Sequence, residues 1–281
     1  MGFPDLEDTI VAPICQFSHL GFCALTGKIL PRYHVDQEQE DFDLVSSEPT
    51  KYSNKTRAFI DMPDSVSWRG VERLKIICPG IVLLEIGDFF PNGKDLLTPR
   101  EAARAEELGP RRRKLFMAAR VALKKLARQI DLFSEDTPDS GIETLGPDRV
   151  KPCLGDSDFY CSVSHANRFV VAVGDVQPIG VDIEVVSEKA VRIWHLFMPA
   201  KNSDFLLSSG LGLERAATRA WTIKEAAAKA FGLNLSEAIR EVEIVLIAER
   251  SSKIRHGGKT YSVKHAEGEG HVLSLLTCGG F

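Results

Sequence analysis

The segment Trp221–Gly232 constrains the fold of this chain more than any other stretch. It is rich in alanine, contains no proline and ends in a glycine that can act as a helix C-cap, so it predicts a helix. On that helix Trp221, Glu225 and Lys229 are spaced four residues apart and share one face. An acid and a base at this spacing often form a simple surface ion pair. Any further role depends on which element packs against this face.

The strand-like segment Ile179–Glu184 suggests such a role. Its two carboxylates, Asp182 and Glu184, are two residues apart and therefore point to the same side of a strand. Three carboxylates gathered in one place repel one another unless a cation neutralises them, and Mg²⁺ prefers oxygen ligands. If helix and strand meet, Asp182, Glu184 and Glu225 are candidate ligands of Mg²⁺. Lys229 would then face bound phosphate groups, as phosphoryl transfer requires.

The same order of elements occurs twice along the chain. Residues 76–175 and 179–278 each read as a strand, then helices that include one long helix, then further strands. The first long helix carries Phe116, Arg120 and Lys124, which are four residues apart like the residues of the later helix. The predicted fold is therefore α+β, with two pseudo-symmetric lobes that each consist of a small, mainly antiparallel sheet packed with helices.

Local signals place the boundaries of these elements. Thr98-Pro99, followed by Glu101, predicts a helix start, and a second helix is expected from Pro110 to about residue 129. The short Ala166-Asn167 link predicts a hairpin of two strands. The other elements are expected at 14–30 (one or two short strands), 74–86 (a strand or bulged pair broken by Pro79-Gly80), 179–186 (strand), 188–197 (helix), 212–231 (helix), and 239–248, 259–265 and 271–278 (strands).

Three parts of the chain are distinguished by this pattern. Residues 1–75 contain an acidic run and a polar, turn-rich stretch, so we interpret them as a partly irregular auxiliary segment. Residues 76–175 form the predicted N-terminal lobe. Residues 176–281 form the predicted C-terminal lobe, which carries the metal site.

The composition excludes several classes of protein. Hydrophobic residues make up 44% and charged residues 26% of the chain, as in an ordinary globular protein, and a net charge of −4 gives no sign of a nucleic-acid partner. No apolar run is long enough for a membrane span, and the N-terminus lacks the layout of a signal peptide. The six cysteines include no C-x-x-C pair and fit free thiols, so we expect a cytoplasmic protein. Two fused lobes favour a monomer.

Three stretches in series resemble the signature of the 4′-phosphopantetheinyl transferase superfamily. They are Ser162-Val163-Ser164-His165, Gly180-Val181-Asp182-Ile183-Glu184 and the helical segment Trp221–Gly232. Each is weak alone, but their order and spacing together are specific. The resemblance covers roughly 75–278, is closer to the large, single-chain, two-lobed subgroup, and leaves 1–75 unaccounted for.

The resemblance implies an enzyme that transfers 4′-phosphopantetheine from coenzyme A to a serine of an apo acyl or peptidyl carrier protein, which is a holo-[acyl-carrier-protein] synthase. Adenosine 3′,5′-bisphosphate would be released. By the same resemblance Asp182, Glu184 and Glu225 hold Mg²⁺ with the pyrophosphate of coenzyme A. Glu225, or a water that it orients, is the base, and Lys229 stabilises the breaking pyrophosphate.

The resemblance also implies which residues contact coenzyme A. Ser164 and His165 would contact the adenosine 3′-phosphate, and Lys224 would lie near the phosphates or the carrier. In the N-terminal lobe the candidates are basic residues of the long helix and the stretch before the Ser-His motif, namely Arg113, Arg120 and Lys151. Three consecutive arginines at 111–113 leave the register of the first contact open.

The basic stretch 99–130 and Lys201 are candidates for steering a carrier protein, because carriers are acidic around the modified serine. Lys201 also marks a departure from the family pattern, since an acidic residue is often found there, and we assign no carboxylate role in that region.

Two alternatives remain open: a non-catalytic module that binds carrier protein or coenzyme A on the same fold, and a Mg²⁺-dependent phosphodiesterase with water as the nucleophile. The absence of a glycine-rich phosphate loop disfavours an ATP-type kinase.

Overall fold

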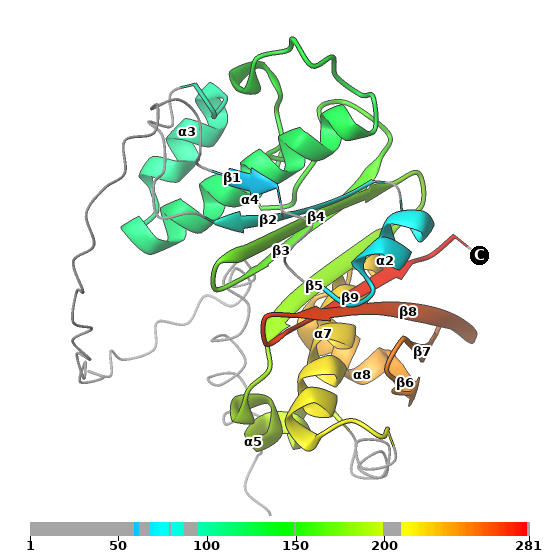
Figure 1. The fold of residues 1–281 in the computed structure, drawn as a ribbon. Coiled ribbons are helices and arrows are strands. Elements are labelled where there is room, and N and C mark those ends of the chain that lie inside the picture. The colour runs from blue at the N-terminus through cyan, green and yellow to red at the C-terminus, as the bar shows by residue number, and fades with distance from the viewer. Residues whose placement is uncertain are drawn as a thin grey trace, which may run out of the picture.

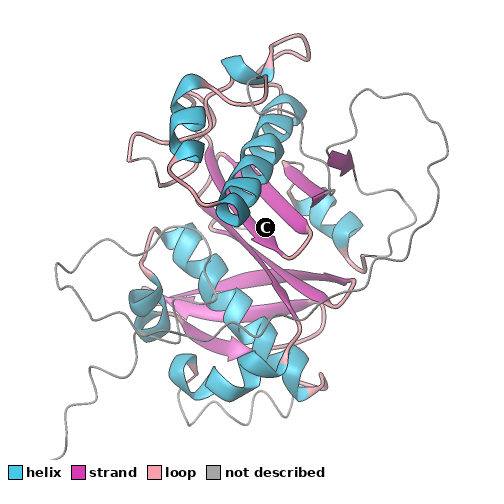
Figure 2. Ribbon diagram, turned by 90° about the vertical axis from the view of Figure 1, so that its left-hand side faces the viewer, coloured by secondary structure: helices cyan, strands magenta, loops and turns pink. Residues whose placement is uncertain are grey.

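A computed structural model describes residues 59–61, 68–78, 80–86, 95–148, 150–198 and 209–279. In this part of the chain two antiparallel sheets are packed with helices (Figure 1). In Figure 2 the strands occupy the middle of the molecule, and helices lie above and below them. The predicted mixed α+β class is confirmed. No described helix is both long and apolar enough to cross a membrane.

The N-terminal sheet has the strand order β1-β2-β4-β3. Its strands are β1 (Phe59–Asp61), β2 (Ile81–Ile86), β3 (Tyr160–Ala166) and β4 (Phe169–Asp175). The predicted hairpin joins β3 to β4. Its turn places Asn167 at a φ of 49°, a left-handed conformation that asparagine tolerates better than most residues.

Two helices accompany this sheet. Helix α3 (Pro99–Glu106) begins with the predicted capping box, in which Thr98 and Glu101 each accept a hydrogen bond from the other residue's backbone N–H. Helix α4 (Pro110–Gln129) lays an apolar stripe on β2 and β4. A short 3-10 helix, η2 (Asp139–Gly141), follows in the connection to β3.

The C-terminal sheet has the strand order β5-β9-β8-β7-β6. Helix α7 packs on β5 and β9, and α5 and α8 pack against α7. Gly180 allows the close approach of α7, because a Cβ at that position would overlap the backbone of Ala226 and Ala230. The bounds are β5 (Ile179–Val185), α5 (Glu188–Phe197), α7 (Leu213–Phe231), α8 (Leu235–Glu241), β6 (Glu243–Leu246), β7 (Ser251–His256), β8 (Lys259–Gly268) and β9 (His271–Thr277).

The internal repeat is visible in the topology. In the first half β2, α4, β3 and β4 follow one another, and the strands lie in the order β2-β4-β3. In the second half β5, α7, β8 and β9 lie in the corresponding order β5-β9-β8. The long helix of each half packs on the corresponding pair of strands, so α4 and α7 are equivalent elements.

The two sheets meet along β3 and β5, which lie side by side in the middle of Figure 1. No ladder of backbone hydrogen bonds joins these two described strands. Instead the hydroxyl of Ser162 accepts from the Val181 backbone N–H at 3.2 Å, and that of Ser164 accepts from the Ile183 N–H at 3.4 Å. An apolar layer from both sheets fills the space beside this seam.

Three local predictions were wrong. Residues 74–77, expected as the start of a strand, belong to helix α2 (Val71–Ile77), in which Leu74 is buried; the buried Cys78 caps the end of the helix. The first residues of the expected strand 239–248 belong to α8, which starts at an Asn234–Glu237 capping box. Strand β7 was missed because its sequence is polar apart from Ile254. The strand expected within 14–30 lies outside the described residues.

Candidate active site

Helix α7 and strand β5 meet at Asp182, which is 3% exposed. The ammonium of Lys229 donates to Asp182 Oδ1 at 2.8 Å and to the Val181 carbonyl at 2.9 Å. The hydroxyl of Ser164 donates to the same Asp182 oxygen at 2.7 Å. Residues from β3, β5 and α7 thus converge on one carboxylate, at the seam between the two sheets.

Glu184 and Glu225 lie close enough to Asp182 for their charges to interact. Burial, together with the negative charges of Asp182 and Glu225, raises the pKa of Glu184 to about 9. Burial, together with the charge of Asp182, raises the pKa of Glu225 to about 7. The pKa of Asp182 is also raised, chiefly by burial, although Lys229 and Ser164 favour its charged form. The cluster is therefore short of positive charge.

Lys229 is the nearby cation that partly compensates this cluster. Burial alone would lower its pKa, but the carboxylates of Asp182, Glu225 and Glu184 outweigh that effect, so its pKa is raised above 10.5. Its side chain is 29% exposed, whereas that of Asp182 is only 5% exposed. The ammonium is thus charged at neutral pH, and its side chain is partly exposed to solvent.

The donor atoms of the cluster suit a hard cation. Asp182 Oδ2 and Glu225 Oε1 are buried without a hydrogen-bond partner, which is costly for carboxylate oxygens unless a cation approaches them. Carboxylates are the side chains that Mg²⁺ prefers. Within the described ranges, however, no three His, Cys, Asp or Glu side chains are already placed around a common metal position. The residues fit the ion chemically, while Lys229 holds Asp182 in the arrangement seen.

Ser164 and His165 point to opposite faces of β3, because side chains alternate along a strand. Ser164 faces Asp182, as described above. His165 is partly buried and shares its face with Val163, which packs in the apolar cluster beneath α4. The structure therefore brings Ser164, but not His165, to the acid cluster.

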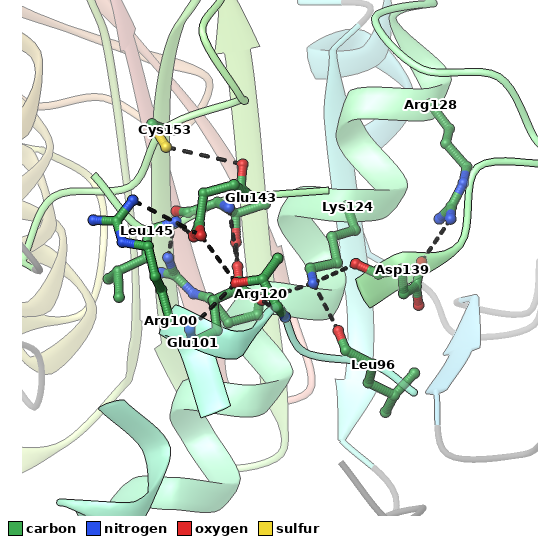
Figure 3. Close-up of polar contacts among 12 residues, drawn as sticks. Leu96, Arg100, Glu101, Arg120, Lys124, Arg128, Asp139, Glu143, Leu145 and Cys153 are labelled. Atoms are coloured by element: carbon green, nitrogen blue, oxygen red, sulfur yellow. Dashed lines mark hydrogen bonds and ion pairs between the residues drawn. The ribbon is translucent and has the colours of Figure 1, made fainter. Parts of the chain in front are cut away.

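Arg120 does not face a phosphate site. Its side chain is buried beside Lys124 and Glu101 (Figure 3). Its guanidinium donates to the Thr144 carbonyl inside the N-terminal lobe. This corrects the expectation that Arg120 faces the nucleotide. Arg113 is exposed at the start of α4, but its guanidinium donates to the carbonyls of Ala105 and Glu106 at the end of α3. Lys151 is exposed in the connection before β3.

Lys224 also lies away from the cluster, which corrects the expectation that it lies near the phosphates or the carrier. Its ammonium is buried and donates to the carbonyls of Ala238, Ile239 and Val242 at the end of α8. Burial lowers its pKa to about 8. Lys224 therefore satisfies the last carbonyls of a helix, which is a structural role.

A buried chain of hydroxyls and one imidazole lies behind the site and was missed from the sequence. Thr222 on α7 contacts the Ser274 hydroxyl at 2.6 Å, and His265 bridges Ser274 and Ser252 at 3.0 and 2.7 Å. Ser274 is also the strand partner of Asp182. Burial lowers the pKa of His265 well below 6.5, so the ring is neutral. The spacing of these residues carries no signal, because they meet only when α7 packs on the sheet.

The fold and the site define an α+β protein with a buried carboxylate cluster that suits a hard cation, beside a lysine suited to anions. Residues 178–276 match the sequence model of the 4′-phosphopantetheinyl transferase superfamily. The matched segment includes Asp182, Glu184, Glu225 and Lys229. No match to the chain was found among curated proteins.

Proposed function

We propose that this protein transfers 4′-phosphopantetheine from coenzyme A to a serine of an apo acyl or peptidyl carrier protein, in a Mg²⁺-dependent reaction that releases adenosine 3′,5′-bisphosphate. The observation that carries the proposal is the convergence of Asp182, Glu184, Glu225 and Lys229 within the segment that matches a transferase superfamily. Neither half of this observation suffices alone, because a family match names no reaction site and an acid cluster names no substrate.

In this proposal Asp182, Glu184 and Glu225 hold Mg²⁺. The bound ion would neutralise charge on the pyrophosphate and polarise it towards attack. Ser164 and the buried position of Asp182 fix the orientation of one carboxylate. Glu225 is buried as well, which strengthens its electrostatic interactions, whereas Glu184 is partly buried.

Glu225 is the proposed base. A general base must lie beside the proton that it accepts, and Glu225 belongs to the carboxylate cluster that would hold the ion and the pyrophosphate. Glu225 would accept the proton of the carrier serine as the serine oxygen bonds to the phosphorus next to pantetheine. The bond from that phosphorus to the bridging oxygen of the pyrophosphate breaks at the same step. Lys229 would stabilise the charge that develops on the departing phosphate of adenosine 3′,5′-bisphosphate.

The start of α4 is the proposed steering surface for the carrier. Arg111 and Arg112 are exposed there and line a shallow hollow of about 430 Å³ together with Gly109, Pro110 and Leu115. Their positive charge complements the acidic surface of a carrier protein and would raise the rate of encounter. Lys201, the other sequence candidate, lies outside the described residues.

The proposal is tested by intact mass measurement of apo carrier proteins after incubation with enzyme, coenzyme A and Mg²⁺. We expect a gain of one phosphopantetheine on at least one carrier of the fatty-acid, polyketide or nonribosomal-peptide type. Glu225→Gln should abolish the gain, whereas Glu188→Gln on the exposed start of α5 should not. Binding of coenzyme A without transfer to any carrier would instead indicate a binding module, and carrier-independent cleavage would indicate a phosphodiesterase.

A further inference from the structure

The Lys229 ammonium contacts a carboxylate oxygen of Asp182 that a metal ion would also use. Asp182 Oδ1 already accepts two hydrogen bonds, one from the Lys229 ammonium and one from the Ser164 hydroxyl. The Lys229 ammonium also donates to the Val181 carbonyl of β5. A divalent cation that bound this carboxylate would therefore meet a positive charge 2.8 Å from Oδ1. An ammonium and a divalent ion that share one carboxylate carry like charges and repel each other strongly inside a protein.

We propose that Lys229 is a tethered cation that competes with the divalent ion, so that this residue sets the metal affinity of the cluster. Lys229 holds Asp182 until the ion binds and then leaves Asp182 Oδ1. The inference rests on the proposed metal site and goes beyond it, because it assigns Lys229 a role before any phosphate is present. The freed ammonium stays within reach of the cluster, where a phosphate group of the substrate can accept its hydrogen bonds.

The exposure of Lys229 makes its departure feasible. Its side chain is 29% exposed, and its flexible four-carbon stem lets the ammonium move into water without a change in α7. Two oxygens that the ion could bind, Asp182 Oδ2 and Glu225 Oε1, are buried and have no hydrogen-bond partner. A divalent ion that binds here would contact both of these unpaired oxygens while it displaces the single ammonium of Lys229.

The equivalent lysine of the other lobe shows the contrasting, fixed arrangement. Lys124 on α4 forms an ion pair with Glu101 at 2.7 Å, and both side chains are fully buried. Its ammonium also donates to the carbonyls of Leu96 and Asp139 (Figure 3). Lys124 has no route to water and Glu101 is satisfied by further hydrogen bonds, including two from Thr144. The same helix position therefore carries a fixed, buried ion pair at Lys124 and a displaceable cation at Lys229.

The test is a calorimetric titration of the full-length protein with Mn²⁺ in the absence of coenzyme A. Lys229→Met removes the competing charge and keeps most of the stem, so we expect Mn²⁺ to bind about tenfold more tightly than in the unmodified protein. Lys229→Arg keeps the charge and should not tighten binding. Lys189→Met removes an exposed charge on α5 and should leave the affinity unchanged.

Equal or weaker Mn²⁺ affinity in Lys229→Met, in protein whose circular dichroism spectrum is unchanged, would overturn the inference. Lys229→Gln provides a second neutral variant if the methionine variant does not fold, and the same tightening is expected from it. Asp182→Asn separates this inference from the proposed metal site. If Asp182→Asn has no effect on Mn²⁺ binding, the metal site itself is wrong. If Asp182→Asn abolishes binding but neither neutral variant tightens it, only the role of Lys229 is wrong.

Discussion

At the scale of single residues, the site is a balance between burial and charge. Asp182 and Glu225 are almost fully buried, and Lys229 is the only cation that an ion pair joins to Asp182 among the described residues. Carboxylates in such surroundings keep their protons to a higher pH than free ones. Proton uptake and metal binding should therefore both influence the stability of the protein.

The first prediction concerns stability against pH. The pKa of Glu225 is raised from 4.5 to about 7 and that of Glu184 from 4.5 to about 9. The stabilisation from these protonated groups is complete below about pH 4.5 and is lost as the pH rises through 7 and 9. In EDTA, denaturant unfolding should therefore show a decreasing free energy of unfolding from about pH 7 to 8, with a slope of about 1.4 kcal/mol per pH unit and proton. Above this range Lys224, whose pKa is lowered to about 8, offsets the decrease.

Saturating Mg²⁺ should flatten this decrease, because the ion replaces the protons. Glu225→Gln should make it shallower, since one titrating group is removed. Lys229 does not complicate the range, because its pKa is raised above 10.5. A free energy of unfolding that rises with pH in EDTA would contradict the assigned charge balance.

How far the site could be predicted depends on the direction of each side chain. Glu225 and Lys229 were placed correctly on one face of α7, because four residues advance a helix by little more than one turn. Lys224 precedes Glu225 by one position, which rotates it by about 100° towards α8. Arg120 lies on the buried side of α4, where its guanidinium donates a hydrogen bond to the Thr144 carbonyl. Sequence spacing separates the faces of a helix, but it does not tell which face meets solvent.

At the scale of elements, the close packing of α7 on β5 determines the site. Gly180 is the position that makes this packing possible, because a Cβ there would overlap backbone atoms of α7. Backbone atoms cannot move aside as a flexible side chain can. The spacing between β5 and α7 therefore depends on a residue that has no side chain of its own.

The second prediction is that Gly180→Ala destabilises the protein by about 1–3 kcal/mol or more and weakens Mn²⁺ binding, because α7 must move away from Asp182. Gly212→Ala is the matched control, since nothing lies within 4 Å of the added Cβ and its φ is −59°. Denaturant unfolding and calorimetry measure the two effects. Equal behaviour of the two variants would show that the close approach is unimportant.

Elements with a strong local signal were predicted well, and those that depend on context were not. The α3 capping box and the β3–β4 hairpin have local causes and appeared as expected. Helix α2 was mistaken for a strand because a short apolar run fits either structure. Its helical form buries Leu74 against the apolar layer between the sheets, a contact that no local pattern encodes.

At the scale of the whole molecule, the two lobes share a topology but differ in what their long helices hold. The order of elements predicted the repeat, and the strand orders bear it out. The way in which the sheets meet was not predictable, because Ser162 and Ser164 bridge to β5 through side chains across 19 residues of sequence. In the N-terminal lobe, Glu101 and Lys124 tie α3, α4 and the 139–144 connection together.

The third prediction follows from this division. Lys124→Met should lower the free energy of unfolding by about 3 kcal/mol, because it leaves the Glu101 carboxylate buried without its cation. The Mn²⁺ affinity of folded protein should stay unchanged. Arg112→Met, at an exposed position of the same helix, is the control and should alter neither quantity by much. A loss of Mn²⁺ affinity in folded Lys124→Met would contradict the separation of scaffold and site.

The most direct test of the central claim is a crystal structure with Mn²⁺ and coenzyme A, with anomalous data at the manganese edge. The account predicts one strong peak about 2 Å from carboxylate oxygens of Asp182, Glu184 and Glu225, with the pyrophosphate completing the coordination. The Lys229 ammonium should have left Asp182 Oδ1 for a phosphate oxygen. A structure at saturating Mn²⁺ without a peak between β5 and α7, and with Lys229 still on Asp182, would contradict the account.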